Sequence, residues 1–283
     1  MLSYRHSFHA GNHADVIKHI TLIAVIEKLK KKNKPFVYID THSGRGLYDL
    51  SSDESRKTAE FEQGIGRLLD NSTGCDQIVI DYIDYVSQYM QSTPPMYPGS
   101  PSIACDLLRE QDKCIFMELH SDEIAKLKRN FNKDSRIAIH HRDGFEGLNA
   151  CMPPEPARGL VLIDPAYEVK QDYADAIKAL KQSIKKWSHG IFLLWYPKLA
   201  RQRDRSEQLK NELAALPIDN LLAVELDVEA QQAEFGMYGS GMLIVNAPYQ
   251  LDTLLEPITQ QLASKLAQDA NAKAHIEWLI EPK

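Results

Sequence analysis

Cysteine is scarce in this sequence, and its placement gives no sign of a metal or redox pair. The four cysteines (Cys75, Cys105, Cys114 and Cys151) contain no CxxC pair, which also argues against a disulfide framework. No apolar run approaches the ~20 residues needed to cross a bilayer, and the first 30 residues lack the apolar centre of a signal peptide. We therefore expect a cytoplasmic protein with no metal and no membrane contact.

Repeats and low-complexity tracts are also absent, and the composition is that of an ordinary globular protein. The 283 residues are 43% hydrophobic and 25% charged, which excludes disordered and fibrous classes and allows a full core. The net charge of −6 argues weakly against a polyanionic partner. Basic side chains nevertheless concentrate in residues 1–34 and again in 198–205. Such clusters are either solvated faces or local contacts to a phosphate backbone.

Apolar segments alternate between strand-like and helical patterns along most of the chain. Strands running apolar on both faces, with helices between them, indicate a mostly parallel sheet covered on two sides. The predicted strands are 36–40, 114–119, 136–141, 159–164, 191–196, 221–228 and 242–247, and the predicted helices are 12–32, 121–131, 145–151, 171–186, 204–215 and 251–268. The last two strands lack a helix between them, which predicts an antiparallel hairpin at one edge, with a glycine-rich turn at 236–241.

The interval between the first two strands is too long for a simple crossover. It exceeds the ~30 residues of a whole βαβ unit, and it contains helical stretches at 54–70 and 76–90. We interpret residues 47–97 as an inserted helical subdomain. Residues 1–46 and 98–283 then form one Rossmann-like domain.

Polar residues gather where the predicted strands end. The first strand runs into the loop Asp40-Thr41-His42-Ser43-Gly44-Arg45-Gly46, whose glycines at spacing two would let the backbone approach a ligand. Glu118 closes the second strand, where a carboxylate can accept both ribose hydroxyls, and Asp143-Gly144 follows the third. A nicotinamide cofactor is the rival ligand. It would need a third glycine opening a helix, which is missing here.

The end of the fourth strand carries Asp164-Pro165-Ala166-Tyr167, which resembles the (D/N/S)PP(Y/F) signature of enzymes that methylate exocyclic amines. A carboxylate and a backbone carbonyl can accept the two N–H bonds of an adenine N6 and direct its lone pair, while an aromatic ring stacks on the extruded base. Ala166 departs from the signature, which has a second proline. The Asp164 carboxylate and the Pro165 carbonyl survive that change.

Taken in order, several segments extend this resemblance over nearly the whole chain. They are MLSYRHSFHAGNHADVIKH, DTHSGRG, YPGSP, RDG, LIDPAYE and LLWYP, and together they resemble the bacterial 23S ribosomal RNA adenine-N6 methyltransferase family J. The resemblance implies a class I methyltransferase fold with an inserted helical subdomain, S-adenosylmethionine as the methyl donor and adenine 2030 of 23S rRNA, naked or partly assembled, as the target.

The same resemblance implies roles for individual residues. Asp164, Pro165 and Tyr167 align with catalytic positions, and Tyr4, His6 and Lys18 with contacts to substrate RNA. The implied donor-binding residues are His19, His42, Ser100, Glu118, Asp143, Gly144 and Asp164. We expect a monomer, and we expect the terminal segment around Tyr4 to lie over the donor site, mobile until RNA binds because it has few apolar anchors.

Two other functions remain open at this point. A DNA adenine methyltransferase would use the same chemistry, although about 50 inserted residues are few for a DNA recognition domain. An RNA-binding protein could use an inactive methyltransferase fold as a platform, which the intact Asp164, Pro165 and Tyr167 argue against.

Overall fold

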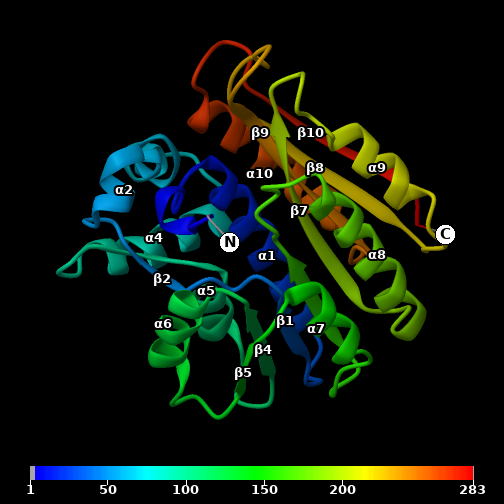
Figure 1. Cartoon of the computed structure of the whole chain (residues 1–283). Coiled ribbons are helices and arrows are strands. Elements are labelled where there is room, and N and C mark those ends of the chain that lie inside the picture. Colours follow the sequence, from blue (N-terminus) through cyan, green and yellow to red (C-terminus); the bar gives the residue numbers. More distant parts are fainter. Residues whose placement is uncertain (1–3, 283) are drawn as a thin grey trace.

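The computed structural model describes residues 4–282 and is built around one twisted sheet (Figure 1). Within these residues the sheet has eight strands in the order β10-β8-β9-β7-β6-β1-β4-β5. The strands are β1 (Val37–Asp40), β4 (Lys113–Glu118), β5 (Ile137–His141), β6 (Gly159–Ile163), β7 (Ile191–Leu199), β8 (Leu221–Asp227), β9 (Met237–Val245) and β10 (Lys273–Ile280). The five strands from β7 to β5 in this order are parallel. The predicted α/β class and mostly parallel sheet are confirmed.

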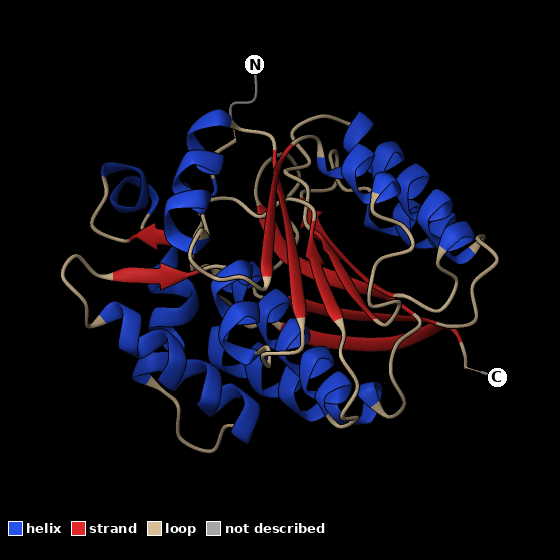
Figure 2. Ribbon diagram, turned by 90° about the horizontal axis from the view of Figure 1, so that it is seen from below, coloured by secondary structure: helices blue, strands red, loops and turns tan. Residues whose placement is uncertain are grey.

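Helices cover both faces of the sheet, as Figure 2 shows. The apolar residues of α1, α5, α6 and α10 pack in one core cluster, and those of α7, α8 and α9 pack in a second cluster on the other face. The helices are α1 (His13–Lys30), α5 (Ser100–Leu107), α6 (Ser121–Phe131), α7 (Gly144–Ala150), α8 (Gln171–Lys186), α9 (Ser206–Ala214) and α10 (Leu251–Leu266). No helix in the described chain is long and apolar enough to span a membrane.

Helix α1 is buried on nearly every side, because it lies between the sheet and the inserted segment. It begins after Asn12, whose side chain accepts a hydrogen bond from the Asp15 N–H. Of its polar residues, Asp15, Lys18 and His19 are all buried near the amino-terminal end. A helix enclosed in this way carries no polar face, so these three side chains must find partners inside the protein.

The predicted helix 76–90 is confirmed, whereas the predicted helix 54–70 is divided into short pieces, and the inserted residues also form a small second sheet. They contain β2 (Leu47–Asp49), α2 (Asp53–Thr58), η2 (Glu62–Gly66), α3 (Arg67–Asp70), α4 (Gln77–Met90) and β3 (Met96–Pro98), and β2 pairs with β3. The predicted helix 54–70 is broken at Ala59, which has φ of +50°, and at Gly64. A Cβ on Gly64 would lie 2.1 Å from the Gly11 oxygen, so the chain bends there to pack on the start of α1.

The predicted hairpin exists, but its position and turn differ from the prediction. β8 and β9 are antiparallel, while the unpredicted β10 occupies the edge. The glycines at 239 and 241 lie inside β9 rather than in a turn. A Cβ on Gly241 would lie 2.5 Å from the Tyr196 hydroxyl oxygen, so this glycine makes room for a buried tyrosine on β7.

Candidate active site

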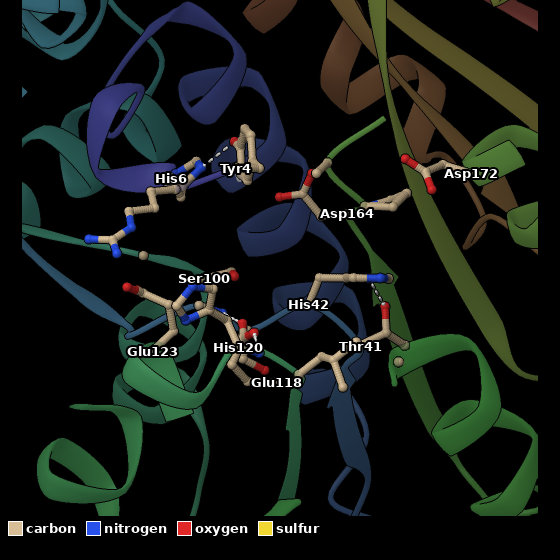
Figure 3. A pocket seen from close by; sticks show the side chains of 18 of the residues that line it. Tyr4, His6, Thr41, His42, Ser100, Glu118, His120, Glu123, Asp164 and Asp172 are labelled. Carbon is tan, nitrogen blue, oxygen red and sulfur yellow. Dashed lines mark hydrogen bonds between the residues drawn. The ribbon is translucent and has the colours of Figure 1, made fainter. Parts of the chain in front are cut away.

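A cavity of about 360 Å³ opens at the carboxyl ends of β1, β4 and β6 (Figure 3). This is the edge where open parallel sheets bind ligands, and the volume lies in the ~300–1,000 Å³ range of small-molecule sites. All the predicted site residues except Tyr167 line it, namely Tyr4, His6, Lys18, His19, His42, Ser100, Glu118, Asp143, Gly144, Asp164 and Pro165.

The loop after β1 turns sharply at its two glycines. Gly44 has φ of +59° and Gly46 has φ of +76°, values that L side chains rarely adopt. The Gly44 N–H donates to Glu118 Oε2 over 2.9 Å, and the His120 N–H donates to the other oxygen over 2.6 Å. Burial raises the pKa of Glu118, although these backbone donors lower it. The carboxylate is therefore held in place at the cavity wall.

Beneath this loop, Asp40 and Ser100 form a buried support. The Ser100 hydroxyl donates to Asp40 Oδ2 over 2.7 Å, and the Tyr38 hydroxyl donates to the same oxygen over 2.6 Å. Ser100 is also the first residue of α5, which follows Gly99. Ser100 thus lines the cavity, whereas Asp40 is fully buried and holds Ser100 from behind.

Asp143 and Gly144 join α7 to the cavity. Asp143 is the N-cap of α7, because its side chain accepts from the Glu146 N–H over 2.9 Å. A Cβ on Gly144 would lie 2.1 Å from the Thr41 oxygen, so only glycine allows α7 to approach the loop after β1 this closely. Asp143 and Gly144 both line the cavity, as expected for the donor-binding residues that the resemblance implied.

The strip after β6 divides at Tyr167. Asp164, Pro165 and Ala166 line the cavity, whereas Tyr167 turns away from it with φ of +50°. The Tyr167 hydroxyl donates to the Trp195 carbonyl over 2.8 Å, and its ring packs against Tyr173 at 4.4 Å. In this structure Tyr167 anchors the strip, and its ring is not available to a base in the cavity.

A chain of polar contacts, here called the polar chain, links the amino-terminal segment to Asp164. The Tyr4 hydroxyl lies 3.0 Å from His6 Nδ1, and His6 Nε2 lies 2.9 Å from Asp15 Oδ2. Lys18 Nζ lies 2.7 Å from Asp15 Oδ1 and 2.6 Å from Asp164 Oδ2. The Lys18 ammonium thereby fixes the carboxylate that the sequence analysis assigns to catalysis. Figure 3 shows Tyr4 and Asp164 on the same side of the cavity.

The segment before α1 has more anchors than its few apolar residues suggested. Arg5 Nη1 lies 2.9 Å from Glu54 Oε1, and the Ser7 hydroxyl donates to Glu54 Oε2 over 2.8 Å. His9 Nδ1 lies 2.9 Å from Glu60 Oε1. The anchors are polar side chains of the inserted residues, which a search for apolar contacts could not find. The segment lies against the cavity, with Tyr4, Arg5 and His6 in its lining.

His19 and His42 are neutral hydrogen-bonding groups in this site. Burial lowers the pKa of His19 to about 3 and that of His42 to about 4. His19 Nδ1 pairs with the Tyr97 hydroxyl at 3.0 Å, while His19 Nε2 is buried and has no hydrogen-bond partner within residues 4–282. Those residues hold no cluster of histidine, cysteine and carboxylate groups fit for a metal ion.

Two acids of the site were missed from the sequence. Asp15 is 1% exposed and holds both His6 and Lys18. Its spacing of three from Lys18 behind an N-cap was a usable signal, because such residues face each other on a helix. Glu123 lines the cavity and accepts from Arg45 Nε and Nη2 at 2.6 Å each. No feature of the sequence alone pairs Glu123 with Arg45.

Comparison with known proteins decides the family. The model of the family "Ribosomal RNA large subunit methyltransferase D, RlmJ" matches residues 33–280. The proteins named ribosomal RNA large subunit methyltransferase J from Haemophilus influenzae and Escherichia coli are each 41% identical over 281 residues, which is 99% of this chain and of each relative. The chain belongs to this family. It is an enzyme that methylates ribosomal RNA of the large subunit, as the resemblance implied.

A solved structure supports the same fold. Protein LPL1258 from Legionella pneumophila superposes with a TM-score of 0.86 at 33% identity, and the match covers 95% of this chain and 98% of that one. The methyltransferase family and the mostly parallel sheet together confirm the predicted class I methyltransferase fold.

Proposed function

We propose that this enzyme transfers a methyl group from S-adenosylmethionine to N6 of adenine 2030 in 23S rRNA, with Asp164 as the catalytic carboxylate. The observation that carries the proposal is the position of Asp164. Its side chain is 17% exposed, borders the cavity and is held at 2.6 Å by Lys18. The adjoining Pro165 supplies a second acceptor, its carbonyl, on the same strip.

The cavity fits the methyl donor in its polar groups. Glu118 can accept the ribose hydroxyls, because each of its oxygens has capacity beyond the one backbone N–H it receives. His19 Nε2, which has no hydrogen-bond partner among the described residues, offers a buried polar contact on the α1 side, and Asp143, which follows β5 and lines the cavity, could accept a hydrogen bond from the amino group of the donor's adenine. S-adenosylmethionine supplies a methyl group bound to a positively charged sulfur.

The protein's own contribution is positioning. The N6 lone pair of adenine is delocalised into the ring, so the free base is a poor nucleophile. Asp164 and the Pro165 carbonyl accept its two N–H bonds and favour tetrahedral geometry at nitrogen. Lys18 keeps the carboxylate oriented. The N6 proton becomes acidic only after methyl transfer, so Asp164 need not be a strong base in the reaction.

The test is incubation of the full chain with labelled S-adenosylmethionine and either unmodified 23S rRNA or duplex DNA, followed by mass mapping of the product. We expect a single N6-methyladenine in the RNA and no label in DNA. Asp164→Ala should raise the activation free energy of methyl transfer by about 2.7–4 kcal/mol, which is the cost of losing one transition-state contact. Asn149→Ala, in α7 outside the cavity, is the control. Transfer by Asp164→Ala within tenfold of wild type would exclude the role.

We further propose that the chain acts as a monomer and that residues 47–97 form an inserted subdomain. Support for the second point is the polar contact of this segment with residues 5–12 through Glu54 and Glu60. Sedimentation at assay concentration tests the first point, with and without RNA.

A further inference from the structure

Two basic clusters were visible in the sequence, and the fold places them at opposite ends of the parallel strands. Lys31, Lys32 and Lys34 lie between α1 and β1, at the amino end of the parallel strands. The residues of the second cluster follow β7, whose carboxyl end shares an edge with the cavity. The second cluster is therefore on the same side of the sheet as a substrate bound at Asp164, and the first cluster is on the opposite side.

The second cluster is not uniform. Lys198 is buried and paired with Glu225 at 3.3 Å and with Asp227 at 2.7 Å, so its charge is used within the protein. In contrast, Arg201 and Arg203 are exposed, and neither they nor Arg205 forms an ion pair within residues 4–282. Three arginines without carboxylate partners are unexpected on a chain of net charge −6.

Asp204, the acidic residue in the loop after β7, forms hydrogen bonds that hold this loop in place. Asp204 accepts from the Ser206 N–H over 2.9 Å and from Gln231 Nε2 over 3.1 Å. Backbone bonds add to this, from Ala200 N to Gly236 O and from Arg201 N to Gln232 O. The loop after β7 is thereby fastened to the β8–β9 connection, and Figure 1 shows the two connections side by side.

An exposed aromatic ring lies on the second of these connections. Phe235 is 73% exposed, although an apolar ring of this size is normally covered. Its neighbour Glu234 is also exposed. Arg201, Arg203, Arg205 and Phe235 are called the arginine rim below. Guanidinium groups beside a free aromatic ring are the combination that binds a nucleic acid strand, through phosphates and a stacked base.

The arginine rim stands beyond the cavity on the side of the catalytic strip. Leu194 of β7 is level with Ile163, and β7 continues to Leu199, which places its end roughly 16 Å further out at ~3.3 Å per residue. Tyr173, whose ring contacts Tyr167, is also close to the rim. Burial raises its pKa to about 12, and the charges of Arg205 and Arg203 act on its hydroxyl to lower it.

We propose that the arginine rim binds the phosphate backbone of the RNA strand that flanks the target adenine. A base extruded into the cavity leaves its neighbouring nucleotides outside, and the rim offers three positively charged side chains without ion pairs, among the described residues, on that side of the protein. The inference rests on the proposed function, because it takes RNA as the substrate.

The test compares two triple variants of the full chain. Arg201→Ala/Arg203→Ala/Arg205→Ala removes the rim charges, and Lys31→Ala/Lys32→Ala/Lys34→Ala removes the same charge from the opposite edge. Dissociation constants for a 23S rRNA fragment are measured at several salt concentrations, together with donor affinity and melting temperature. We expect the arginine variant to bind RNA about tenfold more weakly, with a salt slope smaller by about 2, and the lysine variant to match wild type.

A second pair separates stacking from charge. Phe235→Ala should weaken RNA binding severalfold, whereas Tyr249→Ala, an 84% exposed aromatic beside Lys28 at the far edge, should not. Equal losses in the two triple variants, or unchanged RNA affinity in the arginine variant, would overturn the proposal. Failure of the proposed function looks different, since wild type itself would then leave the RNA unmethylated.

Discussion

The ammonium of Lys18 lies 2.6 Å from Asp164 Oδ2, although 146 positions separate the two residues in the chain. Lys18 is 4% exposed and also contacts Asp15. Burial lowers the pKa of this lysine, but the two carboxylates outweigh burial and hold it well above its ordinary value. The ammonium therefore stays charged and ties α1 to the strip after β6.

Lys18→Met should damage both stability and catalysis. The substitution removes the lysine partner of buried Asp15, and breaking a buried ion pair costs roughly 3–5 kcal/mol. Asp164 also loses the contact that orients it, so single-turnover methyl transfer should slow. Urea unfolding and transfer rates measure the two effects. Lys32→Met, just beyond α1 and exposed, is the control and should change neither. A variant with wild-type transfer would show that Asp164 is oriented by other means.

Asp15 should make stability depend on pH at the acid end. Burial raises its pKa, but the charges of His6 and Lys18 outweigh burial and place it well below the ordinary 3.8. At low pH the unfolded chain binds a proton that the folded chain does not, so this contribution is present above about pH 4 and is lost as the pH falls. The variant Asp15→Asn lacks this titrating carboxyl group. The difference in melting temperature between wild type and variant should therefore narrow from pH 7 to pH 3, and a constant difference would contradict this.

Glu118→Ala should weaken donor binding more than it slows the chemical step. Contacts to ribose hydroxyls are made equally in ground and transition states, so their loss raises KM rather than lowering kcat. A hydrogen bond to a charged group contributes ~1.5–3 kcal/mol, which corresponds to at least a tenfold loss of affinity in calorimetry. Unchanged affinity would mean that the donor lies elsewhere in the cavity.

Ala166→Pro should be tolerated. The Ala166 N–H donates no backbone hydrogen bond in the described part of the chain, so proline removes no contact there. It reduces the freedom of the unfolded chain, and stability should rise by at most about 1 kcal/mol if the backbone angle suits proline. Activity should stay near wild type because the acceptor carbonyl belongs to Pro165. A many-fold rise in kcat would show that stiffness of the strip limits the reaction.

The sequence determined the alternation of strands and helices and the chemistry at the strand ends. Apolar runs such as 159–164 appear as buried strands because local patterning and burial agree there. Glu118, Asp143 and Asp164 could be placed at one edge because parallel strands all end on the same side of a sheet. The family resemblance added the ligand and the RNA.

Which side chains contact one another depends on how distant parts of the chain pack together. The ion pair of Lys18 with Asp164 depends on α1 packing across the sheet, and the anchoring of Arg5 by Glu54 depends on how the inserted residues fold back. The sequence analysis assigned Tyr167 to catalysis, yet a positive φ and a hydrogen bond from its hydroxyl to the Trp195 carbonyl turn its ring away from the cavity. Contacts between residues far apart in the chain are set by packing and burial of the whole fold, and local residue patterns carry no record of them.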